Sequence, residues 1–210
     1  LAKLGGMAPA RREERPRGKL ELPKGIGPLL PPHRDYLAGR NIDPDYASEV
    51  WDVRGIGIAA NLSWRLFLPA ILQGETVSWT TSSISSRART RYVSAGKTQE
   101  RAPLKSLLFG EPLARHAICV CEGPLDALRI GAGGVATCGL SWTAAQVERI
   151  GRFPLRLICL DSEPKAQQRA RQLCRQLEGI SGRTILVELQ SKDPCAASDK
   201  EINELRKLLD

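Results

Sequence analysis

Short apolar runs alternate with amphipathic stretches through the second half of the chain. Ala117–Cys121 is apolar at every position, which is typical of a strand buried on both faces of a sheet. The stretch 164–177 places its apolar residues at steps of four, three and four, which predicts a helix. The predicted strands are 117–121, 134–137, 156–160 and 184–189, and the predicted helices are 124–130, 143–150, 164–177 and 198–209. This βαβαβαβα order predicts an α/β fold, with a parallel central sheet flanked by helices on both faces.

The first half has a different pattern. Residues 1–19 are rich in Arg, Lys, Gly and Pro without apolar periodicity, so we expect a basic disordered tail. Residues 23–32 are interpreted as a linker, and short helices are predicted near 33–39 and 43–50. Strand-like runs follow at 65–69, 76–80 and 91–94. We therefore predict a small mixed α+β N-terminal subdomain at 20–110 and the parallel-sheet domain at 111–210.

The composition is that of an ordinary globular protein, with 42% hydrophobic and 26% charged residues. Residues 1–110 carry 17 basic and 10 acidic residues, which favours either a polyanionic partner or simply a soluble surface. No apolar run is long enough to span a bilayer, so we expect no membrane partner. The six cysteines form no C-x-x-C pair, so we expect reduced thiols and a cytoplasmic location.

Acidic residues follow three of the predicted parallel strands. Glu122 follows the first strand, Asp161 and Glu163 follow the third, and Asp193 follows the fourth. Because the carboxyl ends of parallel strands meet at one edge of the sheet, we expect these side chains to converge. Carboxylate oxygens are the ligands that Mg²⁺ prefers, and two such ions support in-line phosphoryl displacement. Taken singly, each acid is equally well explained as a loop residue or a helix cap.

The combination resembles the three acidic motifs of the Toprim domain, which DnaG-type primases share with topoisomerases and some nucleases. The motifs read Glu122-Gly-Pro-Leu-Asp, Asp161-Ser-Glu-Pro and Lys192-Asp-Pro. Upstream, Tyr36-Leu-Ala-Gly-Arg and Lys105-Ser-Leu-Leu-Phe-Gly are similar to segments of primase catalytic cores. The upstream likeness points to a primase of phage or plasmid type, located in the host cytoplasm if a phage encodes it.

The resemblance implies an enzyme, a DNA-directed RNA polymerase that makes short RNA primers on a single-stranded DNA template by two-metal nucleotidyl transfer. It implies Mg²⁺ or Mn²⁺ as cofactor and ribonucleoside triphosphates as substrates. A replicative helicase and a zinc-binding domain outside this chain are implied as partners. The implied catalytic residues are Glu122, Asp161 and Glu163, and the implied metal ligands are these three and Asp193. The implied contacts to nucleic acid or nucleotide are Arg91, Lys105, Arg87, Arg89 and Lys192.

Three departures from the family pattern keep two alternatives open. Glu163 stands where the second motif usually has Asp, and Cys195 replaces a further acid that usually follows Asp-Pro. The usual Gly-Gly-Arg is replaced near residues 80–82. The alternatives are a Toprim nuclease that uses the same acids to cleave DNA, and a primase-like DNA-binding protein with reduced catalysis.

Overall fold

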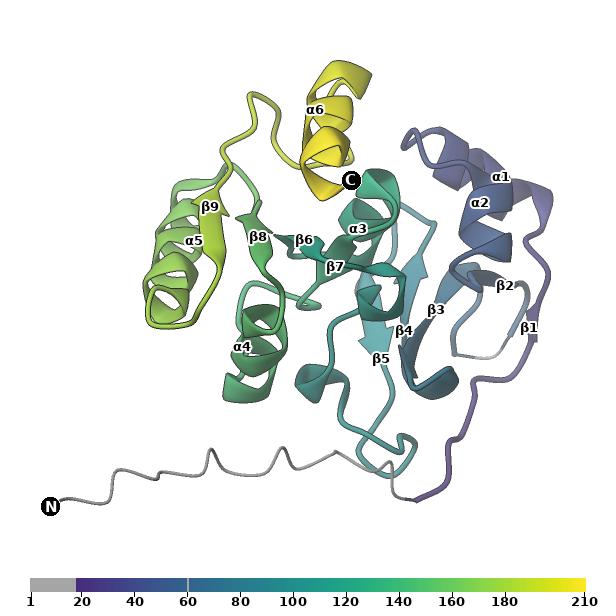
Figure 1. Cartoon of the computed structure of the whole chain (residues 1–210). Coiled ribbons are helices and arrows are strands. Elements are labelled where there is room, and N and C mark those ends of the chain that lie inside the picture. Colours follow the sequence, from purple (N-terminus) through teal and green to yellow (C-terminus); the bar gives the residue numbers. More distant parts are fainter. Residues whose placement is uncertain (1–17, 60) are drawn as a thin grey trace, which may run out of the picture.

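The computed structural model describes residues 18–59 and 61–210, and these form two sheets that lie side by side (Figure 1). Most of the predicted tail, residues 1–17, lies outside the described residues. The antiparallel sheet has the order β1-β2-β3-β4-β5, and the parallel sheet has the order β7-β6-β8-β9. The predicted α/β class, with a mixed α+β part before a parallel sheet, is confirmed.

The antiparallel sheet is a meander built from residues 26–94. Its long hairpin, Arg65–Leu72 (β3) and Glu75–Ser83 (β4), turns at Gln73 and Gly74, which both have positive φ. Such a two-residue turn matches the natural twist of the paired strands. The shorter members and the accompanying helices are β1 Ile26–Gly27, β2 Arg54–Ile56, β5 Tyr92–Ser94, α1 Pro31–Ala38 and α2 Pro44–Glu49.

The parallel sheet follows from residue 117 onward, after two short 3₁₀ turns at Leu104–Ser106 (η1) and Glu111–Leu113 (η2). All three of its strand pairs are parallel, as predicted. Its strands are β6 Ala117–Cys121, β7 Gly134–Ala136, β8 Leu155–Ile158 and β9 Arg183–Leu186. Its helices are α3 Pro124–Ile130, α4 Ala144–Gly151, α5 Pro164–Leu177 and α6 Asp199–Leu209.

Local signals fix where these helices begin. The Thr143 hydroxyl accepts a hydrogen bond from the Gln146 backbone N–H, and Ser198 does the same for Glu201. Each glutamine or glutamate side chain returns the bond to the cap residue, which completes a capping box. α3 and α5 instead have proline in the first turn, where no N–H is needed. None of the described helices has the length and apolarity to cross a membrane.

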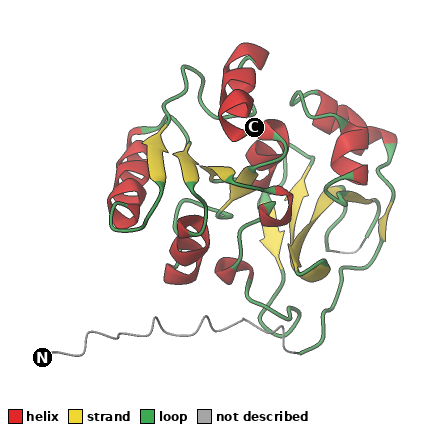
Figure 2. Cartoon of the chain, in the orientation of Figure 1, coloured by secondary structure: helices red, strands yellow, loops and turns green. Residues whose placement is uncertain are grey.

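Side chains on β6 alternate between two apolar layers. Ile118 and Val120 pack in a cluster with residues of α4 and α5, whereas Cys119 and Cys121 pack in another with residues of α3 and α6. The helices therefore cover both faces of the parallel sheet, as Figure 2 shows, and each strand residue is buried whichever way it points.

The second of these layers does not stop at the parallel sheet. It continues through Trp51, whose ring stacks on Phe109 at 5.5 Å, to Leu66 and Leu68 on β3 and Leu37 on α1. The predicted boundary between residues 110 and 111 separates the two sheets along the chain, but one apolar core crosses it.

The strands that sequence patterning missed are the shortest ones. β1 and β2 lie where we expected a linker and loop, and they pair through residues 26–27 and 55–56. β8 and β9 end at residues 158 and 186, before the predicted ends at 160 and 189. The apolar tails of both predicted strands leave the ladder and lead toward the sheet edge.

Gly110 at the junction of the sheets allows a direct test of this shared core. A Cβ there would lie 2.5 Å from the Gly134 carbonyl oxygen and 2.7 Å from the Trp51 ring, whereas one at Gly74 meets no atom within 4 Å. Both glycines have positive φ, near 85° and 81°. We expect Gly74→Ala to lower the free energy of unfolding by about 1 kcal/mol from backbone strain. Gly110→Ala should cost about 2 kcal/mol more from overpacking.

Urea unfolding of both variants measures the difference. Equal losses for the two variants would show that residue 110 is not tightly packed between the sheets.

Candidate functional site

A cavity of about 510 Å³ lies at the carboxyl edge of the parallel sheet, facing the antiparallel sheet. Both halves of the chain line it. Its acidic residues are Glu122, Asp126, Asp161 and Asp193. Its basic residues are Arg40, Arg91 and Lys192. Three of the four acids named from the sequence, Glu122, Asp161 and Asp193, are thus brought together.

Parallel register explains this convergence. Val120 of β6 is level with Ile158 of β8, and the Cys159 N–H donates to the Val120 carbonyl at 2.9 Å. The chain then leaves both strands at the same level, and Glu122 and Asp161 follow within a few residues. The loop after β9 is tied alongside because the Ser162 N–H donates to the Lys192 carbonyl at 2.8 Å. This bond brings Asp193 next to Asp161.

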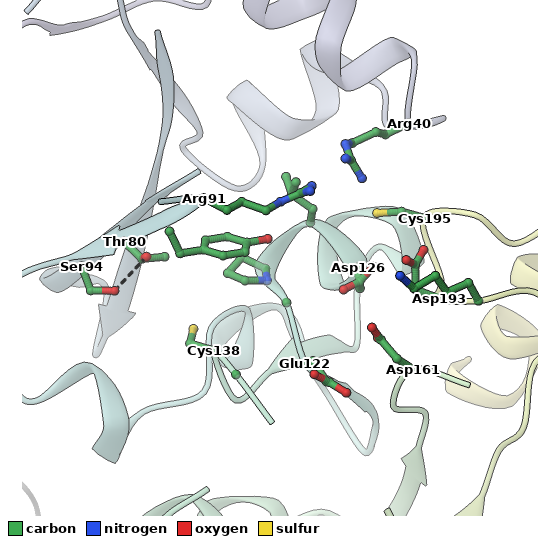
Figure 3. A pocket seen from close by; sticks show the side chains of 16 residues that line it. Arg40, Thr80, Arg91, Ser94, Glu122, Asp126, Cys138, Asp161, Asp193 and Cys195 are labelled. Atoms are coloured by element: carbon green, nitrogen blue, oxygen red, sulfur yellow. Dashed lines mark hydrogen bonds between the residues drawn. The ribbon is translucent and has the colours of Figure 1, made fainter. Parts of the chain in front are cut away.

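Gly123 separates Glu122 from the first turn of α3, and its lack of a side chain is required there. A Cβ at this position would lie 2.8 Å from Asp126 Oδ2 and 3.3 Å from the Tyr92 hydroxyl. The Asp126 carboxylate therefore packs directly on the backbone of the turn. Figure 3 shows the carboxylates of Asp126, Asp161 and Asp193 directed toward one shared space.

The crowded acids hold their protons more tightly than ordinary acids do. Burial, followed by repulsion from Asp161, raises the pKa of Glu122 to about 7. Burial also raises the pKa of Asp126 to about 6, with a further contribution from Asp193. The pKa of Asp161 is raised by burial and then by Asp193. A carboxylate pKa that is raised both by burial and by neighbouring acids marks a place where a cation is favoured.

The residues of the cavity fit a divalent cation. One oxygen of Glu122, Oε1, is buried and has no hydrogen-bond partner, although a buried carboxylate oxygen ordinarily has one. Asp126, Asp193 and Cys195 each offer a ligand atom, and these atoms lie within 4.8 Å of one another. Several oxygen donors on one side of an open cavity suit Mg²⁺ or Mn²⁺, which retain sites for water and phosphate.

Arg40 and Arg91 come from the antiparallel half of the chain, whereas Lys192 lies among the acids. Arg91 donates from Nη2 to the Tyr36 hydroxyl at 3.1 Å, and its guanidinium lies near the Tyr92 ring. The buried Arg65 holds this segment in place, because it donates to the carbonyl oxygens of Thr90 and Arg91. The cavity therefore combines a cation-binding floor with a wall that can contact phosphate.

Other residues named from the sequence lie elsewhere. Glu163 does not line the cavity; its exposed carboxylate pairs with Lys192 Nζ at 3.3 Å. Lys105 Nζ donates to the carbonyl oxygens of Thr137, Cys138 and Ser141, at 2.9 to 3.0 Å, so it fixes the loop after β7. Arg87 and Arg89 lie on the exposed loop before β5 and do not line the cavity.

Asp126 is not among the metal ligands expected from the sequence. In the structure it lines the cavity and is one of the clustered ligand candidates. Its position four residues after Glu122 was the available signal. The first turn of the helix that follows β6 brings a residue at this spacing back toward the end of the strand. Arg40 was also missed as a site residue, although it is the arginine of the Tyr36-Leu-Ala-Gly-Arg segment noted in the sequence.

Comparison with solved structures identifies the architecture. The primase of Aquifex aeolicus, solved with its zinc-binding and RNA polymerase domains, is 17% identical, with a TM-score of 0.70 over 86% of this chain and 55% of that one. A DnaG catalytic core is 15% identical, with a TM-score of 0.66 over 85% of this chain and 73% of that one. This chain has the fold of a DnaG-type primase catalytic core.

The phage branch of this fold is similar too. The primase fragment of the bacteriophage T7 primase-helicase protein is 14% identical, with a TM-score of 0.59 over 90% of this chain and 79% of that one. No protein-family model and no curated protein sequence matches the chain. The primase fold is therefore established by structure, while the chain spans little more than half the length of the Aquifex primase structure.

The acid cluster predicts a pH dependence of stability in metal-free protein. The folded-state pKa of Glu122, about 7, exceeds its ordinary value of 4.5, so folding favours the protonated form. The associated stability is fully present below pH 4.5 and is lost as the pH rises through about 7. We expect Glu122→Gln, which stays neutral, to flatten this decline.

Urea unfolding in chelator between pH 4.5 and 8 measures the profile. In Glu122→Gln, titration of Asp126 should still cause a smaller loss of stability, which ends near pH 6. Glu148→Gln, which alters an exposed acid on α4, is the control and should keep the wild-type profile. Parallel profiles for wild type and Glu122→Gln would contradict the burial of this carboxylate.

Proposed function

We propose that this chain is a primase catalytic core, which joins ribonucleotides into short primers on single-stranded DNA. The observation that carries the proposal is the cavity itself, where four carboxylates at the end of the parallel sheet face Arg40, Arg91 and Lys192. The DnaG-type fold supports the same reading. Template-directed nucleotidyl transfer needs both features, since it brings two polyanions and a metal-dependent reaction into one site.

The acids divide into two roles. Asp126, Asp161 and Asp193 hold the divalent ions, which when bound neutralise the developing charge on the transferred phosphate. Glu122 has a buried oxygen without a hydrogen-bond partner and a pKa near 7, so it can accept the proton of the attacking 3′-hydroxyl at neutral pH. Glu163, which the resemblance implied as a third catalytic acid, is on the margin of the cavity and holds Lys192 there.

The cations position the substrates. Arg91 is braced by the Tyr36 hydroxyl and by Arg65 below it, so its guanidinium is presented to the cavity with few alternative positions. Arg40 and Lys192 flank the acids, where they can contact the phosphates of an incoming nucleotide. Exposed Arg87 and Arg89 lie on the loop that leads to Arg91 and can extend the track for template DNA.

The partners follow from the proposed reaction. They are single-stranded DNA and ribonucleoside triphosphates, and a cytoplasmic location follows with them. A helicase and a zinc-binding domain are proposed because the T7 relative is a primase-helicase protein and the Aquifex structure includes a zinc-binding domain. A phage or plasmid origin remains a proposal of the same kind.

Primer synthesis tests the proposal. The full chain with Mg²⁺ or Mn²⁺, single-stranded DNA of mixed sequence and labelled nucleotides should yield short oligoribonucleotides. Glu122→Gln should lower the rate at least about 100-fold through loss of the general base. Glu163→Gln should keep most of the activity because that carboxylate lies outside the cavity, and Glu148→Gln all of it.

Two outcomes overturn the proposal. Metal-dependent nicking of plasmid DNA without any oligoribonucleotide would identify a nuclease. Salt-dependent DNA binding without turnover would identify a binding protein.

Arg91 generates a separate prediction about DNA binding. In a plot of log affinity against log salt concentration, removing one phosphate contact makes the slope shallower by about 0.7 for single-stranded DNA. We expect this change in Arg91→Ala, measured by fluorescence anisotropy across a salt series in chelator. Arg152→Ala, at the C-cap of α4, where the arginine pairs with Glu148, is the matched control. An unchanged salt slope in Arg91→Ala would place the template elsewhere.

A further inference from the structure

A thiol stands among the carboxylates at the acidic edge. Cys195 Sγ and one oxygen each of Asp126 and Asp193 lie within 4.8 Å of one another. Two ligands on one ion, at about 2.3 Å for sulfur and about 2.0 Å for oxygen, are at most about 4.3 Å apart. Small side-chain rotations therefore suffice to bring all three onto a single ion.

The backbone holds this sulfur in place. The Ala196 N–H donates to Asp193 Oδ1 at 2.8 Å and to the Asp193 carbonyl at 3.1 Å, which closes a tight turn around Pro194. Cys195 is 8% exposed and packs in the same apolar core as α3 and α6. Asp193 and Cys195 thus project from one rigid turn toward Asp126, as Figure 3 shows.

Cys195 borders two cavities. Cys195, Asp193 and Arg40 line the main cavity, and the same three residues line a second cavity beside α1. Burial and the neighbouring Asp126 raise the pKa of the Cys195 thiol, and Arg40 opposes them only in part, so the thiol is protonated until an ion displaces the proton. On coordination the thiol proton passes to solvent, and sulfur forms the new bond to the ion.

The other donors in the cavity leave a role for this ligand. Glu122 Oε1 is buried without a partner in the same cavity, and Glu163, the second acid of its motif, is paired with Lys192 and does not line the cavity. The donor set is therefore three or four carboxylates and one sulfur, rather than oxygen alone. Mg²⁺ binds oxygen almost exclusively, whereas Co²⁺, Zn²⁺ and Cd²⁺ accept sulfur readily.

We propose that Cys195 is a ligand of a divalent ion at this edge, shared with Asp126 and Asp193, and that it shifts the preference of the site from Mg²⁺ toward thiophilic ions. The inference rests on the proposed function only in placing the ion at the acids of the proposed reaction. Its test needs no turnover.

Cobalt is the probe for the sulfur bond. Titration of the full chain with Co²⁺ alone should give the intense near-ultraviolet band of a thiolate bound to cobalt. Cys195→Ser should abolish the band while keeping the size of the side chain. Cys138→Ser is the matched control, since Cys138 lines the same cavity but lies outside the cluster, and this variant should keep the band.

Competition between Cd²⁺ and Mg²⁺ measures the preference. We expect Cys195→Ser to weaken Cd²⁺ binding at least about tenfold by calorimetry, since changes even to groups behind the ligands cost 10- to 100-fold in affinity. Cys195→Asp should strengthen Mg²⁺ binding and weaken Cd²⁺ binding. The urea midpoint of each variant shows whether it is folded.

The possible outcomes separate this inference from the proposed function. Cobalt binding without the band, or a band that survives in Cys195→Ser, overturns the inference and leaves primer synthesis possible. Unchanged Cd²⁺ affinity in Cys195→Ser shows that the thiol only donates a hydrogen bond to Asp126, and also overturns it. The band without oligoribonucleotide synthesis supports the sulfur ligand and overturns the proposed function. A chain that binds no divalent ion overturns both.

Discussion

Parallel pairing of β6 with β8 is the constraint on which the site depends. It brings two strand ends to one level, so that residues 38 positions apart in the chain share a small volume. The sequence places an acid after each end, and the resulting repulsion is opposed by the packing of the sheet between its helix layers and, at Asp161, by the charge of Lys192. Such a cluster is stable because the energy that holds the strands comes from apolar side chains elsewhere. The crowding raises the pKa of the acids, so they keep their protons more readily, and a bound cation can replace those protons.

The antiparallel half supplies two of the three basic residues of the cavity. The parallel half contributes all four acids of the cavity, whereas Arg40 and Arg91 come from the other half. Arg91 is aimed by contacts within that half, to Tyr36 and through the backbone bonded by Arg65. Charge complementarity is therefore divided between the two sheets, and neither half on its own forms the described cavity.

Much of the parallel half was predictable because its signals are local. The uniformly apolar run at 117–121 and the capping boxes at Thr143 and Ser198 require no knowledge of distant residues. β1 and β2 were missed because they are two and three residues long and pair across about 30 positions. Asp126 shows the same limit at the site. Glu163 directly precedes α5, which begins at Pro164, and its carboxylate pairs with Lys192 of the cavity, a contact that alternation along the chain does not predict.

The continuous apolar core between the sheets has a consequence for how substrates enter. Trp51, Phe109 and the side chains around them pack as one body from α1 to α6, so the angle between the two sheets cannot open like a hinge without exposing that body to water. In the proposed function, a nucleic-acid strand that enters the cavity would be accommodated by its own bending and by loop and side-chain adjustments at the rim. The distance between the two sheets is then fixed by the shared core, and it would limit which nucleic-acid strands fit between them.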